Sequence, residues 1–194
     1  MSWATRPATP EDADHLARLI AEAGEGIPQT VWAGMAEPGE SVWDVGRRRA
    51  ARDEGAFSYR NARVGTVDGE VVAVLMGYPL PDPPEPWDPT EMPAMFVPMQ
   101  ELEDLAPGSW YVNVLAAYPD RRGRGYGRRL LDEAREMARA LGHDRLSIIV
   151  NDHNPAQRLY ARAGYVEAAR RRIVRSGGWD APGVDWVLML AEAG

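Results

Sequence analysis

The strongest constraint on the fold lies in residues 110–150, where a strand-like run, a glycine-rich turn and a helix-like run follow one another. The apolar run WYVNVLAAY predicts a buried strand, and the segment RRGRGYG follows it at Arg121–Gly127. Apolar residues then recur at the spacing of an amphipathic helix up to Gly142, after which RLSIIV predicts a second strand. A strand, a helix and a strand in this order predict a parallel pair joined by a right-handed crossover.

The flanking segments predict a mixed α/β sheet. Asp68-Gly69 lies between two strand-like runs and predicts a hairpin turn. Gly and Pro are frequent in residues 24–40, for which the sequence predicts a loop. We expect further strands at 3–8, 59–67, 70–78, 165–174 and 185–193, and further helices at 10–23, 42–55 and 155–164.

Residues 79–109 interrupt the regular pattern. They hold nine of the sixteen prolines in the chain, so long helices or strands are not expected there, and one short helix is expected around Met95–Leu105. A loop of this length is unusual within a compact domain and is often functional. We interpret residues 1–194 as a single domain that carries this Pro-rich, acidic insert.

Composition excludes several classes of site. The chain has no cysteine, which rules out disulfides, cysteine metal ligands and a thiol nucleophile, and no spacing of His, Asp and Glu predicts a metal site. Its net charge of -7 and its lack of a long apolar segment argue against nucleic-acid and membrane partners. The N-terminal residues do not resemble a signal peptide, so we expect a soluble, cytoplasmic protein.

The glycine segment at Arg121–Gly127 has the features of a phosphate-binding loop. Gly123, Gly125 and Gly127 permit positive φ and leave room for a ligand, and amides that precede a helix attract anions. The spacing R-x-x-G-x-G differs from the dinucleotide fingerprint G-x-G-x-x-G, and a chain without Lys has no P-loop. Two other interpretations stay open: a tight turn with surface arginines, or an Arg-Gly segment that binds RNA.

A second motif lies downstream, where NPAQRLYARAGYVE spans Asn154–Glu167. Together with R-x-x-G-x-G at Arg122–Gly127, it resembles the GCN5-related N-acetyltransferase (GNAT) superfamily, closely over residues 110–167 and in element order over the whole chain. The resemblance implies a mixed, mostly antiparallel sheet with a central, splayed parallel strand pair, flanked by helices. It also implies acetyl-CoA as the cosubstrate.

The resemblance further implies which residues contact acetyl-CoA. The amides of Gly123–Arg128 would bind the pyrophosphate, and the strand backbone before them would pair with the pantetheine arm. The Ala117 amide is our candidate for stabilising the oxyanion, and Tyr160 would protonate the leaving thiolate as general acid. The residues expected to contact the cosubstrate are Leu115, Ala116, Ala117, Arg122, Gly123, Arg124, Gly125, Tyr126, Gly127, Arg128, Asn154 and Tyr160.

The general base is not evident from the sequence. Many GNAT proteins carry a Glu on the strand before the second motif, where this chain has Ile148 and Ile149. Asn113, a polar residue in an apolar strand, is our second catalytic candidate, since it could touch substrate or hold a water; satisfying a backbone group is an equal alternative. We expect an N-acetyltransferase with direct transfer in a ternary complex, and the alternative is a non-catalytic acyl-CoA sensor or regulatory domain.

The expected acceptor is a primary amine of a small molecule or peptide. Residues 79–109 carry seven acids and no basic residue, and residues 21–46 also carry acids without bases. Together they could form an acidic mouth that attracts a cationic amine, although a solvated acidic loop is the alternative. The insert or the final strands could also pair two subunits into a homodimer. Aromatic candidates for stacking or cation–π contact with the acceptor are Trp32, Trp43, Trp87 and Trp110.

Overall fold

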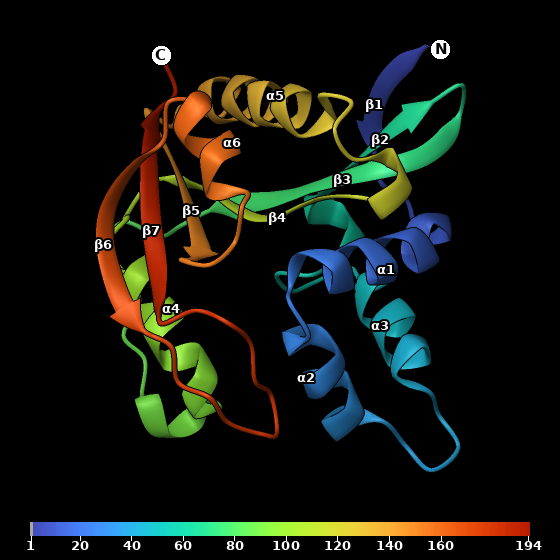
Figure 1. The fold of residues 1–194 in the computed structure, drawn as a ribbon, viewed down its shortest axis with the longest axis vertical. Coiled ribbons are helices and arrows are strands. Elements are labelled where there is room, and N and C mark those ends of the chain that lie inside the picture. Colours follow the sequence, from blue (N-terminus) through green and yellow to red (C-terminus); the bar gives the residue numbers. More distant parts are fainter. Residues whose placement is uncertain (1) are drawn as a thin grey trace. The chain divides into compact units, whose positions relative to one another are not determined.

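The computed structural model describes residues 2–194, in which seven strands form one sheet (Figure 1). The strands are β1 Trp3–Pro7, β2 Ala62–Val67, β3 Glu70–Pro79, β4 Trp110–Ala117, β5 Arg145–Asn151, β6 Val166–Arg172 and β7 Asp185–Glu192.

The strand order is β1-β2-β3-β4-β5-β7-β6. β4 and β5 run parallel, with Trp110–Val112 beside Leu146–Ile148, whereas β1-β2, β2-β3, β5-β7 and β6-β7 are antiparallel. The predicted parallel pair and the mixed, mostly antiparallel sheet are therefore confirmed. The splay of the parallel pair stays a prediction.

Six α-helices accompany the sheet within the described residues. They are α1 Ala13–Ala23, α2 Ile27–Met35, α3 Val42–Ala50, α4 Val97–Glu103, α5 Tyr126–Ala140 and α6 Gln157–Arg162. Apart from α2, each corresponds to a helix that the sequence predicts. None of the helices within residues 2–194 combines the length and apolar character that crossing a membrane requires.

The loop predicted for residues 24–40 is wrong, because α2 occupies its middle. Gly26 adopts φ 91 just before the helix, and Pro28 lies in the first turn, where its missing N–H costs no hydrogen bond. Trp32 of α2 is buried, and a Cβ built on Gly46 of α3 would come within 2.8 Å of its ring. Burial against α3 thus stabilises a helix whose Gly and Pro residues suggest a loop.

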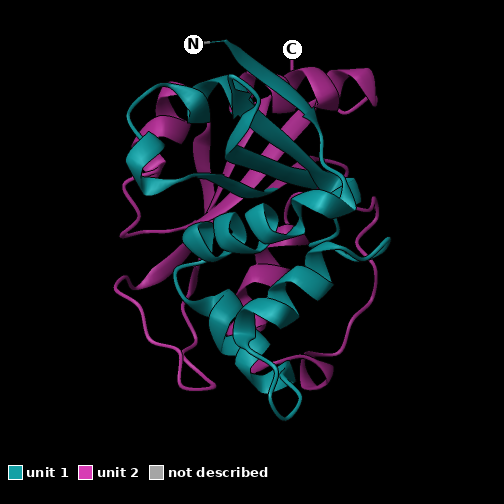
Figure 2. Cartoon of the chain, turned by 90° about the vertical axis from the view of Figure 1, so that its right-hand side faces the viewer, with its two compact units in different colours: residues 1–77, 113–130 teal, residues 78–112, 131–194 magenta. Residues whose placement is uncertain are grey.

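The chain forms two compact units (Figure 2). The first contains residues 1–77 and 113–130, and the second contains residues 78–112 and 131–194. β4 contributes residues to both, since its first three residues belong to the second unit and the remainder to the first. The single domain predicted for the whole chain stays a prediction.

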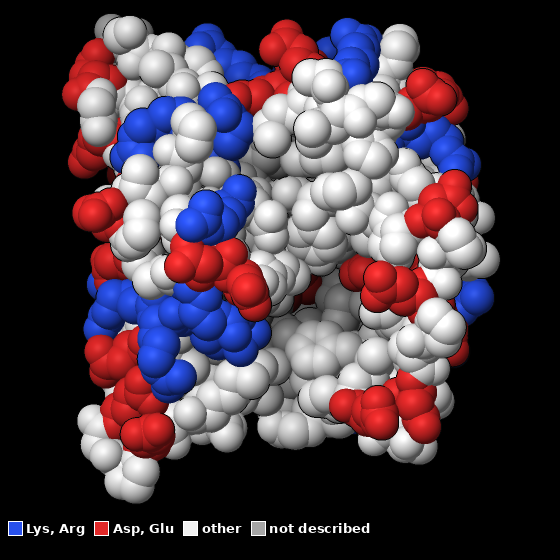
Figure 3. Space-filling view, turned by 180° about the vertical axis from the view of Figure 1, so that it is seen from behind, with Lys and Arg blue, Asp and Glu red and all other residues white. Residues whose placement is uncertain are grey.

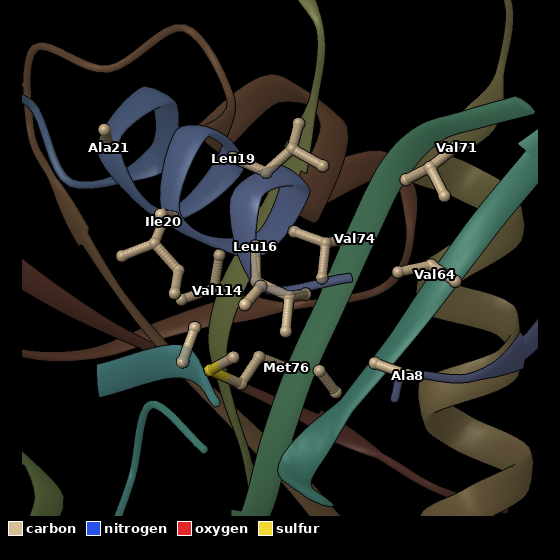
Figure 4. Close-up of a cluster of buried hydrophobic side chains, with 14 of the residues drawn as sticks. Ala8, Leu16, Leu19, Ile20, Ala21, Val64, Val71, Val74, Met76 and Val114 are labelled. Atoms are coloured by element: carbon tan, nitrogen blue, oxygen red, sulfur yellow. The ribbon is translucent and has the colours of Figure 1, made fainter. Parts of the chain in front are cut away.

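The core of the first unit lies between α1 and the strands β2 and β3 (Figure 4). Leu16, Leu19 and Ile20 recur at helical spacing and point from α1 toward the sheet. They meet strand side chains such as Val64 and Val74, and none of these five is more than 2% exposed. This burial fixes α1 on the sheet.

In the second unit, α4 packs against β5, β6 and β7. The short helix predicted within the insert is therefore confirmed. Ser109, which ends the insert, is fully buried, and its hydroxyl lies 2.7 Å from that of Ser147 on β5. The Ser109 hydroxyl also lies 2.7 Å from the Ala106 carbonyl. These bonds hold the end of the insert against the parallel strand pair.

Candidate active site

The glycine segment joins β4 to α5 in the first unit and leaves space beside its backbone. Gly123 and Gly125 adopt φ of 75 and 82, which residues with a Cβ rarely take. A Cβ built on either would meet no other atom within 4 Å. The Arg129 N–H donates to the Gly125 carbonyl at 3.2 Å, and the first amides of a helix lack a partner within it. Open space beside a positive helix end suits an anion.

The arginines before the glycines hold this segment in place. The Arg121 guanidinium pairs with Glu70 at 2.7 Å. Arg122 donates to the Ala117 carbonyl at 3.2 Å and to the Glu22 carboxylate at 2.8 Å. The side chain of Arg122, a predicted cosubstrate contact, is thus engaged in fixing the turn to the end of β4 and to α1.

Tyr126 anchors the start of α5 through its side chain. The buried ring stacks on Trp3 of β1, with ring centroids 4.7 Å apart, and the Arg129 guanidinium lies 5.7 Å from the same Trp3 ring. Arg124 donates to the Asp120 carbonyl at 3.3 Å. For Tyr126 the main-chain amide is therefore the group that a ligand would use.

Asn113 differs from its neighbours on β4. Its side-chain nitrogen is buried and has no hydrogen-bond partner among the described residues. Leu115, Ala116 and Ala117, which follow it on the strand, are half-buried. Because an unpaired buried donor costs about 1–3 kcal/mol, Asn113 is suited to donate to a bound group.

The second motif forms the turn between β5 and α6 in the second unit. Asn151 is buried at the end of β5; its Oδ1 accepts from the His153 N–H at 2.9 Å and its Nδ2 donates to the Pro182 carbonyl at 2.7 Å. The Asn154 side chain accepts from the Ala156 N–H at 2.8 Å. The N-cap of α6 is Ala156 and it has no side-chain cap, so Asn154 holds the turn before the helix and does not cap it.

Tyr160 lies on α6 among other tyrosines, with only 5% of its surface exposed. Its ring centroid is 6.1 Å from that of Tyr165, whose hydroxyl is buried without a hydrogen-bond partner in the described chain. Burial raises the pKa of Tyr111 on β4, and the charges of Glu103, Tyr78 and Tyr160 raise it further.

Glu103 is a candidate that the sequence did not identify. It ends α4, half-buried, and loss of hydration followed by the charge of Asp104 raises the pKa of Glu103 to about 7. In the sequence it is one of seven acids in a Pro-rich segment, and only the fold distinguishes it from exposed acids such as Glu85 and Glu91. Its place in a short helix with apolar residues was the one available signal.

The glycine turn at a helix start, with a buried tyrosine on the following short helix, is the arrangement that the two sequence motifs predict. A family model described as the acetyltransferase (GNAT) family matches residues 31–165. The chain belongs to this GNAT family. Within residues 2–194, the structure has no group of three or more His, Asp or Glu side chains that could hold a metal ion.

Known relatives of this GNAT protein agree with that assignment. A mycothiol acetyltransferase from Beutenbergia cavernae is 31% identical over 170 residues, which are 80% of this chain and 55% of that relative. The chain thus spans about half the length of this curated relative.

Solved structures show the same fold. An acetyltransferase has a TM-score of 0.66 at 22% identity, covering 98% of this chain and 100% of that chain. An agmatine N-acetyltransferase has a TM-score of 0.65 at 18% identity, covering 99% and 100%. The polyamine N-acetyltransferase of Drosophila melanogaster has a TM-score of 0.63 at 18% identity, covering 98% and 100%.

Some acids predicted to form the acidic mouth of this GNAT protein are paired with arginines. Glu40 binds Arg48 at 2.9 Å, and Glu101 binds Arg171 at 2.6 Å. Figure 3 shows basic and acidic side chains close together on the side of the molecule that carries α3. The acidic mouth stays a prediction, and its remaining candidates are the exposed acids of the insert, Asp82, Glu85, Asp88 and Glu91.

Two of the four tryptophans expected near the acceptor are part of the protein interior. Trp32 is 4% exposed and Trp110 is 1% exposed, so the prediction that they stack on a ligand is wrong. Trp43 and Trp87 are half-buried. The Trp43 ring centroid lies 5.5 Å from the Arg18 guanidinium, so Trp43 makes a cation–π contact with Arg18 of the same chain.

Proposed function

We propose that this GNAT protein moves the acetyl group of acetyl-CoA to a primary amine of a small molecule or peptide, by direct transfer within a ternary complex. The observation that carries the proposal is the open space beside Gly123 and Gly125 at the start of α5. Both glycines have positive φ, a conformation in which successive amides can face one concavity. The pyrophosphate of acetyl-CoA has the charge and size for this place.

Acetyl-CoA would be held mainly by the main chain. The amides of residues 123–128 bind the pyrophosphate, and the backbone of residues 115–117 pairs with the pantetheine arm. Arg122 and Tyr126 support this indirectly, because their side chains fix the turn and the helix start. Asn154 contributes by holding the start of α6, where its side chain accepts a backbone N–H.

Three further groups would take part in the reaction. The amine nitrogen attacks the thioester carbonyl, and the Ala117 amide stabilises the oxyanion that develops. Tyr160 gives its proton to the departing sulfur. Asn113, with its unpartnered buried nitrogen, donates a hydrogen bond to a substrate.

The acceptor is proposed to be a cationic amine. Solved structures of the same fold include enzymes named for agmatine and for polyamines. The insert supports this proposal, because its exposed acids would attract a cation from solution. A panel of agmatine, spermidine, amino acids and peptides tests the acceptor class, and turnover of anionic acceptors alone would overturn it.

The substitution Tyr160→Phe tests the catalytic proposal. It should lower kcat by one to several decades, because the thiolate then departs without its acid, and leave the affinity for acetyl-CoA nearly unchanged. Tyr165→Phe is the matched control, since it removes a neighbouring buried hydroxyl that has no partner within residues 2–194. Its kcat should equal that of the wild type.

The second candidate function is acyl-CoA binding without turnover, as a sensor or regulatory domain. It is favoured by Ile148 and Ile149, which stand where many GNAT proteins carry an acid; Ile148 is 3% exposed and cannot act as a base. The panel of amines separates the transferase from the sensor. A wild type that binds acetyl-CoA and acetylates no member of the amine panel would favour the sensor.

A further inference from the structure

Asn151, the last residue of β5, is a buried polar residue at the point where the chain leaves the sheet for α6. It is only 1% exposed, so its polar atoms need partners within the protein. Its Oδ1 accepts from the His153 N–H at 2.9 Å, and its Nδ2 donates to the Pro182 carbonyl at 2.7 Å. The side chain thus joins two segments of the second unit, the turn before α6 and the connection between β6 and β7.

The connection between β6 and β7, residues 173–184, is held by contacts of its own. The Arg175 guanidinium donates to the Gly183 carbonyl at 2.7 Å. Trp179 is buried and stacks on Trp186 of β7, with ring centroids 6.1 Å apart and ring planes 7° apart. This segment is therefore anchored where it meets the end of β5.

The fit between this segment and Asn151 is close. Gly183 adopts φ 107, and a Cβ built on it would overlap the Asn151 side chain and lie 2.7 Å from the Asp152 carboxylate. Asp152 adds two hydrogen bonds, since its Oδ1 accepts from the Val184 N–H and its own N–H donates to the Asp185 carbonyl, each at 2.9 Å. The end of β5 is thus attached to the segment through both side chains and backbone.

In the other direction, a short series of hydrogen bonds leads from Asn151 to Tyr160. The Asn151 carbonyl accepts from the Asn154 N–H and from Gln157 Nε2, each at 2.9 Å. The Asn154 side chain accepts from the Ala156 N–H at 2.8 Å, and the Ala156 carbonyl accepts from the Tyr160 N–H at 3.1 Å. The orientation of the helix that carries Tyr160 therefore depends on how the turn before it is held.

We propose that Asn151 is a positioning residue for the acetyl transfer. By joining residues 173–184 to the turn before α6, its side chain holds α6 in the orientation in which the Tyr160 hydroxyl reaches the departing sulfur. This inference rests on the proposed acetyl transfer. Asn151 acts through Tyr160 and is not itself a catalytic residue. A displacement of about 1 Å at a catalytic group can lower a rate on the order of 100-fold, so the residue that prevents it contributes directly to kcat.

The substitution Asn151→Ala tests the assignment, with Ser147→Ala as the matched control. Ser147 lies on the same strand, is likewise fully buried, and has its hydroxyl 2.7 Å from that of Ser109. Asn151→Ala should lower kcat with agmatine or spermidine about 10-fold or more. The affinity for acetyl-CoA should be nearly unchanged, because the amides of residues 123–128 are left as they are. Ser147→Ala should keep the wild-type kcat, although both variants lose thermal stability with a buried hydrogen bond.

Two further variants separate positioning from a general loss of structure. If Asn151 acts through Tyr160, the two residues form one unit, and Asn151→Ala should lower kcat by about 2-fold at most when Tyr160→Phe is already present. Asn151→Ser keeps a hydroxyl that can accept the His153 N–H, as serines do in such turns. Its kcat should therefore lie between those of Asn151→Ala and the wild type.

The outcomes distinguish this inference from the proposed function. If the wild type transfers acetyl groups and Asn151→Ala has the wild-type kcat, or loses the same factor with and without Tyr160→Phe, the positioning role is wrong and the transferase stands. If the wild type acetylates no amine, both fail. Should Asn151→Ala not fold, as judged by circular dichroism, Asn151→Ser decides: a lowered kcat with unchanged acetyl-CoA affinity would support the assignment, and a wild-type kcat would overturn it.

Discussion

Gly125 and Gly142 flank α5 with almost the same φ, 82 and 81, and a Cβ on either would meet nothing within 4 Å. A side chain at either position costs roughly 1–2 kcal/mol of backbone strain. The two glycines differ in their proposed roles, because Gly125 belongs to the phosphate-binding turn and Gly142 ends the helix. This pair therefore separates the effect of strain from the effect of a blocked site.

Gly125→Val should abolish acetyl-CoA binding in isothermal titration calorimetry, because the new side chain fills the space proposed for the pyrophosphate. Gly142→Val should bind acetyl-CoA as the wild type does, while losing a similar amount of thermal stability. Equal acetyl-CoA affinity in the two variants would show that the glycine turn does not hold the cosubstrate.

Single residues were predictable where the backbone demands a particular residue type. Gly123 and Gly125 take positive φ, and Asn154 accepts the Ala156 N–H in the turn before α6, so both leave a sequence signal. Glu103 leaves only its place in a short helix as a signal, since burial and then the charge of Asp104 raise its pKa. The roles of Tyr160 and Asn113 stay predictions.

At the scale of elements, α2 shows what the sequence did not convey. Its contact with α3 depends on Gly46, where a Cβ would come within 2.8 Å of the buried Trp32 ring. Gly34, on α2 itself, is exposed, and a Cβ there meets nothing within 4 Å. Local composition predicted a loop because residues 24–40 are rich in Gly and Pro, whereas the packing of Trp32 against Gly46 of α3 holds this segment as a helix.

Gly46→Ala and Gly34→Ala should therefore have opposite effects on the free energy of unfolding. Gly46→Ala should lower it by about 1–2 kcal/mol, since the clash with Trp32 exceeds the gain in helix propensity. Gly34→Ala should raise it by about 0.5 kcal/mol. Urea denaturation measures both values, and a stabilised Gly46→Ala variant would contradict the packing described for α2 and α3.

For the whole molecule, the strand-helix-strand rule and the two motifs were enough to predict a mixed sheet with β4 and β5 in parallel. The crossover rule works from chain order alone, so it needs no knowledge of packing. The acceptor could not be predicted in the same way, because its contacts depend on how the insert and the first helices fold. The paired acids Glu40 and Glu101 illustrate this, since each meets an arginine that the sequence does not link to it.

The most direct test of the central claim is to incubate the protein with acetyl-CoA and agmatine, spermidine or a peptide, and to measure released CoA and acetylated amine together by mass spectrometry. We expect one acetylated amine for each CoA released, with both products lost in Tyr160→Phe and retained in Tyr165→Phe. Tight binding of acetyl-CoA with no acetylated amine from any acceptor would contradict the account.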